Sequence, residues 1–238
     1  MSSFEAARKA LHQLSDPARA KVQRGFFKNS GEDIFLGVPT PSLRKIAKEF
    51  VQLPLSDIRR LMQSTVHEER SLANEILCRQ FRNAAEAGQK RIFDFYIRNR
   101  KLIREWDAVD GTAPYIVGPW LLDRDKAILH ELVLSPRLWD RRIAIVATWW
   151  FIRKGRVDDT FALAEILLSD PEDLIHKATG WMLREAGQER PARPRALPAQ
   201  APCIHAPDRT PLRHRTLPAG RETTLPAAAR TAIPPALS

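Results

Sequence analysis

The sequence contains few cysteines, and the two that occur, Cys78 and Cys203, lie far apart in the chain. This scarcity excludes a disulfide framework and a zinc site built from cysteines. Long hydrophobic runs are also absent, because the longest, Ile143 to Ile152, has ten residues, whereas a transmembrane helix needs about 20. The first ten residues are amphipathic and polar, unlike a secretion signal. We therefore expect a soluble, cytoplasmic protein without membrane segments.

Glycine-rich loops that bind phosphates or dinucleotides are missing, and strand-like alternation is scarce. The six histidines show no paired spacing typical of a metal site. We interpret them as surface or local polar groups: His12, His67, His130, His176, His205 and His214. The sequence therefore predicts neither a cofactor nor a metal ion.

The net charge of +10 is divided between two parts of the 238-residue chain that differ in composition. Residues 1–190 contain all of the tryptophan and phenylalanine and carry a net charge of +5. Residues 191–238 contain 10 of the 18 prolines and seven arginines, but no Phe, Trp, Tyr or Lys. Such a segment buries too little apolar surface to offset the entropy of ordering it. We predict one domain over residues 1–190 and a disordered Pro/Ala/Arg-rich segment over residues 191–238.

Residues 1–190 read as a succession of helices joined by short connections. A capping oxygen followed by proline, typical of helix starts, recurs at Asp16-Pro17, Thr40-Pro41, Ser135-Pro136 and Asp170-Pro171. A capping box is expected at Thr65 to Glu68. With the 3–4 spacing of apolar residues, these features predict helices over residues 4–14, 17–28, 41–51, 56–64, 67–83, 88–101, 103–117, 124–133, 137–153, 158–168 and 171–187. Helix pairs that start about every 30 to 45 residues favour an all-α fold, a HEAT-like helical-repeat superhelix or α-α solenoid.

Two segments combine aromatic and charged residues in patterns that suggest chemistry. Trp106 and Asp110 are four residues apart and would share one face of a helix. Lys177, Trp181 and Arg184 would form a basic–aromatic–basic stripe on another helix. The alternative for each tryptophan is an ordinary place in the hydrophobic core, with Asp110 a surface residue.

Arg141 and Arg142 are adjacent near the start of the helix predicted over residues 137–153. Neighbouring residues of a helix point about 100° apart. The two arginines therefore cannot face solvent in the same way, and one is expected to border an inner surface. Basic residues at a helix start are unfavourable with the helix dipole, unless an anion such as phosphate binds there.

Together these segments resemble the AlkD-like DNA alkylation repair family, the HEAT-like-repeat DNA glycosylases. The resemblance runs from about Phe26 to Glu189 and depends on four anchors in the order and at the separations of the family. They are Phe35–Pro41 (FLGVPTP) with Arg44 and Lys48, Trp106–Asp110 (WDAVD), Trp139–Arg142 (WDRR) and His176–Glu185 (HKATGWMLRE). Any one anchor alone would be a weak signal, but four in order are specific.

The resemblance implies a right-handed superhelix whose basic concave face grips double-stranded DNA. It implies a monomeric hydrolase of base excision repair that removes cationic alkylated purines such as 3-methyladenine and 7-methylguanine. The resemblance makes Asp110 the catalytic carboxylate, with Trp106 and Trp181 as aromatic walls around the lesion nucleotide. The DNA-binding residues that it implies are Arg142, Thr40, Arg44, Lys48 and Lys177.

The chemistry of the substrate suits this small set of groups. Alkylation at N3 or N7 makes the purine cationic, so it leaves as a neutral base without a general acid. One carboxylate near the sugar can stabilise the oxocarbenium-like transition state and orient the attacking water. Each indole face attracts a cationic nucleotide by roughly 0.5–2 kcal/mol. The main alternative is a DNA-binding helical-repeat module without excision activity, and a protein–protein scaffold is a third hypothesis.

Residues 191–238 depart from the family, which continues with further helical repeat. The abrupt change at Arg190-Pro191 is typical of a GC-rich gene read out of frame. Permitted codons for Asp208 to Leu217 give an amphipathic helical sequence after a one-base shift. A frameshift near residue 190 would uncover the last helix and lower the stability and activity of the chain. The competing interpretation is a genuine basic segment that adds nonspecific affinity for DNA.

Overall fold

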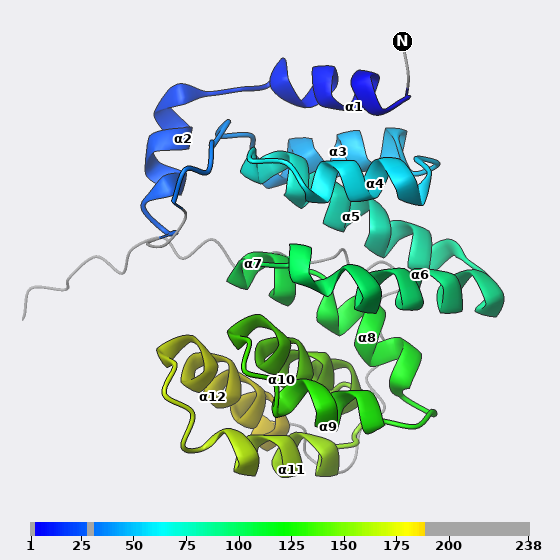
Figure 1. The fold of residues 1–238 in the computed structure, drawn as a ribbon, viewed down its shortest axis with the longest axis vertical. Coiled ribbons are helices and arrows are strands. Elements are labelled where there is room, and N and C mark those ends of the chain that lie inside the picture. Colours follow the sequence, from blue (N-terminus) through cyan, green and yellow to red (C-terminus); the bar gives the residue numbers. More distant parts are fainter. Residues whose placement is uncertain (1–2, 28–30, 189–238) are drawn as a thin grey trace, which may run out of the picture. The chain divides into compact units, whose positions relative to one another are not determined.

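A computed structural model describes residues 3–27 and 31–188, which all fall in one compact unit. The regular secondary structure of these residues is helical throughout (Figure 1). The α-helices are α1 (Ser3–His12), α2 (Pro17–Arg24), α3 (Thr40–Glu49), α4 (Leu55–Met62), α5 (His67–Asn83), α6 (Glu86–Asn99), α7 (Trp106–Asp110), α8 (Ala113–Leu121), α9 (Ala127–Val133), α10 (Leu138–Ile152), α11 (Asp158–Leu167) and α12 (Asp173–Gln188). A short 3-10 helix, η1 (Arg100–Leu102), follows α6.

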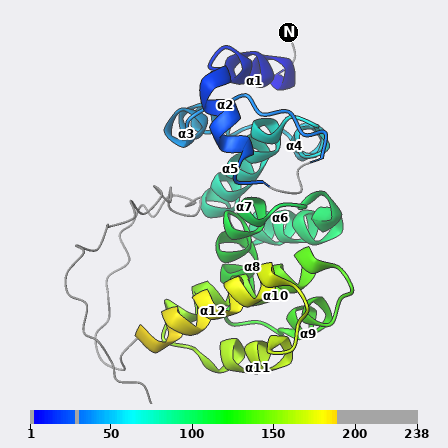
Figure 2. The same ribbon diagram turned by 90° about the vertical axis from the view of Figure 1, so that its left-hand side faces the viewer.

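The helices pack against near neighbours in the chain, as in a helical-repeat solenoid (Figures 1 and 2). In the N-terminal half, α3, α4 and α6 pack against α5. In the C-terminal half, α8, α9, α11 and α12 pack against α10, and α8 also packs on α6. The predicted all-α helical-repeat fold is therefore confirmed, with α5 and α10 as the two central helices.

The longest apolar run of the sequence, Ile143 to Ile152, forms most of α10. Its residues from Ile143 to Thr148 are buried, because five other helices, α7, α8, α9, α11 and α12, pack against α10. The packing against α8 is close at Gly118, where a Cβ atom would lie 2.5 Å from the Ala147 carbonyl oxygen. Within the part of the chain that the structure describes, no helix is long and apolar enough to cross a membrane.

α5 is polar in sequence and yet buried on all sides over its first three turns, from His67 to Cys78. Buried charges are costly unless they are paired and hydrogen-bonded. Two preceding segments, α1 and the loop before α3, supply the partners. The Glu68 carboxylate accepts hydrogen bonds from the backbone N–H groups of Leu36 and Gly37, Glu69 accepts one from Arg8, and Arg70 donates to Asp33. These contacts tie the N-terminal segments to α5.

Glu68 does not form the predicted capping box, because its carboxylate binds the loop before α3 instead. α5 begins at His67 without a side-chain cap on its N-terminal N–H groups. The bound loop turns at Gly37, whose φ of 77° lies in the left-handed region. A Cβ atom there would stand 2.2 Å from the Asp16 carbonyl oxygen, so only glycine fits. This loop places Phe35 against the start of α5.

The prediction of a single helix over residues 103–117 is wrong. The structure has two helices there, α7 and α8, separated at Gly111 and Thr112. Pro114 lacks the N–H that would bond to the Asp110 carbonyl and continue the helix. The buried Thr112 hydroxyl fixes the break by donating to the Ala108 carbonyl at 2.6 Å and lying 2.9 Å from the Tyr96 hydroxyl. Asp110 is thus the last residue of a short helix.

The predicted helix over residues 67–83 is confirmed at both ends, and most others agree within a few residues. The disordered segment predicted over residues 191–238 and the domain boundary at residue 190 lie outside the described residues. They stay predictions, as does the proposed frameshift.

Candidate functional site

Asp110 and Arg142 form a buried, two-point ion pair. Arg142 Nε donates to Asp110 Oδ1 at 2.9 Å, and Nη2 donates to Oδ2 at 2.7 Å. Both residues are only 5% exposed. The remaining nitrogen, Nη1, donates to the Leu174 backbone carbonyl. Parallel N–H···O bonds of this kind are stronger than neutral hydrogen bonds and fix the plane of the carboxylate.

Three helices meet through this pair. Asp110 ends α7, Arg142 lies at the beginning of α10, and Leu174 is in the first turn of α12. The predicted split between the neighbouring arginines is found: Arg142 is buried, while Arg141 is partly exposed and pairs with Asp170. The structure thus brings together two residues, Asp110 and Arg142, that the resemblance assigned to one site.

The electrostatics of Asp110 reflect its burial. Burial raises the pKa of its carboxyl, the Arg142 guanidinium opposes that rise, and the nearby Asp107 carboxylate adds to it, so that the pKa lies above its ordinary value. The charged form of Asp110 therefore depends on Arg142.

Trp106 begins α7 and is partly exposed. One face of its indole is covered by Phe27, whose ring centroid lies 5.5 Å away at an interplanar angle of 16°. Trp106 is therefore neither a fully buried core residue nor a free aromatic surface. One face is taken by Phe27, and the exposed remainder is available to a ligand.

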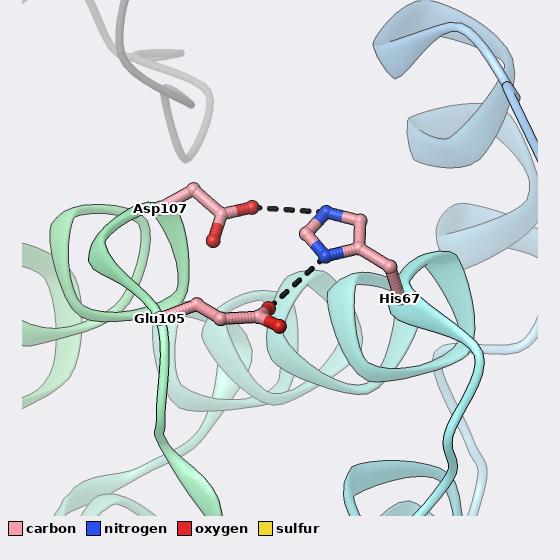
Figure 3. A group of neighbouring side chains, drawn as sticks. All are labelled: His67, Glu105 and Asp107. Carbon is pink, nitrogen blue, oxygen red and sulfur yellow. Dashed lines mark ion pairs between the residues drawn. The ribbon is translucent and has the colours of Figure 1, made fainter. Parts of the chain in front are cut away.

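The residues on both sides of Trp106 bind His67, a contact that the sequence interpretation missed (Figure 3). His67 Nδ1 lies 3.0 Å from Glu105 Oε2, and Nε2 lies 3.2 Å from Asp107 Oδ2. The histidine is 2% exposed, so its interpretation as a surface or local polar group is wrong. Burial alone would lower its pKa, but the attraction of Asp107 and Glu105 raises the pKa of His67 from 6.5 to about 10.

The carboxylates around His67 belong to a larger charged cluster. Arg70 binds both Glu105 and Asp33, and Arg104 Nη2 lies 3.1 Å from Asp33 Oδ1. With His67 protonated, the cluster contains three cations and three anions, listed as His67, Arg70, Arg104, Asp33, Glu105 and Asp107. Among these six residues the positive and negative charges are therefore equal in number.

His67, Glu105 and Asp107 are residue types that bind metals, and their donor atoms lie within 4.8 Å of one another. Each carboxylate, however, faces a different nitrogen of the ring (Figure 3). A metal ion uses one imidazole nitrogen, with ligands about 2.0–2.2 Å away, and requires a neutral ring. The geometry and the charge balance therefore favour an imidazolium that bridges two carboxylates.

The other residues assigned by the resemblance are spread over α12 and α3. Trp181 lies two turns beyond Leu174 in α12, is partly buried, and donates from Nε1 to Glu185 Oε1 at 3.2 Å. Lys177 is exposed, with Nζ 2.6 Å from Asp173 Oδ2. The remaining residues, Thr40, Arg44 and Lys48, follow one another at four-residue intervals along α3, with Lys48 exposed and the other two partly exposed. Their DNA-binding roles stay predictions.

Comparison with known proteins relates this arrangement to a family. A solved structure described as a predicted DNA alkylation repair enzyme from Enterococcus faecalis is similar, with a TM-score of 0.55 and 19% sequence identity. The match covers 73% of this chain and 84% of that one, and at this identity it shows the fold alone. No curated protein sequence matches. A family model described as DNA alkylation repair enzyme matches residues 7–197, most of the chain. The chain therefore belongs to the DNA alkylation repair enzyme family, which supports a role in DNA repair.

Proposed function

We propose that the protein is an alkylpurine DNA glycosylase. It hydrolyses the N-glycosidic bond of cationic purines such as 3-methyladenine and 7-methylguanine in duplex DNA, as a monomer and without a cofactor. The observation that carries this proposal is the buried Asp110 carboxylate, held at two points by Arg142 beside the partly exposed Trp106.

Asp110 has the properties that this reaction needs. A cationic purine leaves as a neutral base, so the protein has to stabilise only the positive charge that develops on the sugar. A carboxylate in a site that excludes water does this more strongly than one in bulk solvent. Asp110 is 5% exposed, and Arg142 favours its charged form.

The hydrogen bonds of Asp110 also leave room for a nucleophilic water. A carboxylate offers about four acceptor positions, two on each oxygen. Arg142 occupies one position on each oxygen, at 2.9 and 2.7 Å. A second position on either oxygen can accept a hydrogen bond from a water and orient it toward the sugar.

Arg142 acts on the substrate through Asp110 in this mechanism. Its Nε, Nη1 and Nη2 atoms all donate hydrogen bonds within the protein, and the residue is 5% exposed. The direct contacts to phosphates are then made by exposed or partly exposed residues, namely Arg44, Lys48 and Lys177, with Thr40 at the start of α3.

The aromatic residues bind the lesion nucleotide. Phe27 occupies one face of Trp106, so the indole offers its other face to the cationic base or sugar. Trp181 is partly buried and would supply a second wall from α12. Each cation–π contact is worth about 0.5–2 kcal/mol and distinguishes a cationic from a neutral purine.

Release of methylated purines from alkylated duplex DNA tests the proposal. We expect Asp110→Asn to retain DNA binding and lose most of the excision activity, because the amide cannot stabilise a cation by charge. Asp170→Asn is the matched control, since Asp170 has the same two-point contact with the neighbouring Arg141. We expect the control to excise at nearly the wild-type rate.

Two results would contradict the mechanism. Equal excision by wild type and Asp110→Asn would remove the carboxylate from the reaction. Salt-dependent binding to duplex DNA without release of any methylated purine would instead identify the chain as a non-catalytic DNA-binding helical-repeat module.

A further inference from the structure

His67 lies at the junction between α5 and the short helix α7. Its imidazole stands between the side chains of Glu105 and Asp107, with one ring nitrogen toward each (Figure 3). These are the residues immediately before and after Trp106 in the chain. The peptide units on both sides of Trp106 are thereby anchored to one ring on another helix.

The faces of the same imidazole reach Trp106 by a second route. Phe35 stacks on the ring at 4.8 Å, and Phe27 packs against it at 4.6 Å. Phe27 then stacks on the Trp106 indole at 5.5 Å. His67 therefore supports Trp106 through the backbone of its neighbours and through the ring that covers one face of the indole.

We propose that His67 is a positioning residue that sets the orientation of Trp106 by bridging Glu105 and Asp107 and by supporting Phe27. The effect of His67 on excision rests on the proposed function, whereas its effect on the orientation of the Trp106 indole does not. The balanced charge cluster strengthens the bridge, because the imidazolium neutralises a site that would otherwise have three anions and two cations.

A second histidine–carboxylate contact, between His12 of α1 and the buried Glu69 of α5, gives a matched control. His12 Nε2 lies 2.6 Å from Glu69 Oε1, and the Glu69 side chain is 2% exposed. Glu69 binds Arg8 and His12 from α1. Loss of this contact should therefore lower stability without changing the orientation of Trp106.

Fluorine NMR of protein labelled with 5-fluorotryptophan tests the orientation directly. The chain has six tryptophans, and the resonance lost in Trp106→Phe identifies Trp106. We expect His67→Gln to shift or split that resonance and to leave the tryptophans of the C-terminal helices unchanged. Glu69→Gln should leave it in place. An unshifted, single Trp106 resonance in folded His67→Gln would overturn the proposal.

Excision kinetics test the consequence for the site. We expect the single-turnover rate of His67→Gln to fall about tenfold to a hundredfold, the loss typical of a misplaced group. The affinity of His67→Gln for duplex DNA should stay near that of the wild type. The single-turnover rate of Glu69→Gln should also stay near the wild-type rate, measured below the melting temperature of that variant. Loss of DNA affinity with an unchanged rate would contradict positioning. Absence of excision in the wild type would refute the proposed function. The NMR result would then decide by itself whether His67 orients Trp106.

If His67→Gln does not fold, the variant Asp107→Asn tests the same proposal by the same NMR measurement. This substitution preserves the size of the side chain and an acceptor oxygen, but removes the charge that pairs with His67. We expect a smaller shift of the Trp106 resonance in the same direction. If the resonance of this folded variant does not move, His67 does not orient Trp106 through Asp107.

Discussion

Arg141 and Arg142 are adjacent in α10, and each binds an aspartate through two hydrogen bonds. The pKa values of the two aspartates are nevertheless shifted in opposite directions. Arg142 holds Asp110 of α7, and Arg141 holds Asp170, which precedes α12. The pKa of Asp110 is raised above its ordinary value of 3.8, whereas the pKa of Asp170 is lowered below it. The same ion pair thus has two different electrostatic outcomes.

The depth of burial differs between the two aspartates: Asp110 is buried as a whole residue, whereas Asp170 is partly exposed, although each side chain is 4% exposed. Burial acts to raise both pKa values. Asp170 overcomes it with the Arg141 contact, a hydrogen bond from the Glu172 backbone N–H at 2.9 Å and a nearby His176. Asp110 instead has the Asp107 carboxylate near it. The surroundings of an arginine–aspartate pair, more than the pair itself, decide whether the carboxylate is a stable anion or a strained one.

The largest expected effect comes from removing the arginine. Arg142→Gln leaves Asp110 buried without a countercharge, a change that costs about 3–5 kcal/mol. Arg141→Gln should cost clearly less, since Asp170 keeps its backbone hydrogen bond from Glu172. Urea denaturation at neutral pH measures both losses. Equal losses would show that the two pairs do not differ as their surroundings indicate.

The pH dependence of stability should have opposite signs in the two aspartate variants. The stabilisation by Asp170 is present above pH 3.8 and is lost as pH falls through its lowered pKa. The contribution of Asp110 is fully present below pH 3.8 and is lost as pH rises through its raised pKa. The free energy of unfolding of the wild type minus that of Asp170→Asn should therefore rise with pH. The corresponding difference for Asp110→Asn should fall with pH. Denaturation curves over a range of acidic pH values check both slopes.

His67 extends the comparison to a buried cation between two carboxylates. Its pKa is raised from 6.5 to about 10, so its stabilising contribution is complete below pH 6.5 and is lost as pH rises through about 10. The free energy of unfolding of the wild type minus that of His67→Gln should be constant below pH 6.5 and decrease toward pH 10. Thermal melting of both proteins across this interval tests the expectation, and a difference independent of pH would argue for a neutral histidine.

The smallest effect is expected at the exposed pair of Lys177 and Asp173, whose side chains are 66% and 76% exposed. Lys177→Gln should change the free energy of unfolding by about 0–1 kcal/mol, as for other surface pairs. If Lys177 contacts a phosphate, the same variant should reduce the salt dependence of DNA binding by about one counterion. Titrations at several salt concentrations measure that slope, with Lys154→Gln, on the turn after α10, as a surface control.

The sequence predicted the repeat of helices well, because helix starts and apolar spacing are local properties. It predicted the break between α7 and α8 poorly, because the break depends on the buried hydroxyl contact between Thr112 and Tyr96 as well as on Pro114. Asp170 was expected to cap a helix. It accepts the Glu172 N–H, but it also binds Arg141, and α12 begins three residues later, at Asp173.

The candidate site was predictable only in part. The resemblance linked Asp110 and Arg142 across 32 positions, and the structure joins them. Their helical spacing alone could not have done so. His67 was missed because its partners, Glu105 and Asp107, follow it by 38 and 40 positions, and an isolated histidine at a helix start carries no sign of burial. Its three charged neighbours in sequence, Glu68 to Arg70, were the only available hint.

The balanced cluster of three cations and three anions around His67 has an evolutionary consequence. Replacing one of its buried members with a neutral residue leaves a buried charge without its full countercharge, whereas replacing an oppositely charged pair together does not. The buried members are His67, Arg70, Glu105 and Asp107. These four buried positions, on α5 and at the start of α7, should therefore be inherited or exchanged in charge-matched pairs among relatives. A lineage that changes one of them alone would have to acquire its compensation elsewhere around Trp106.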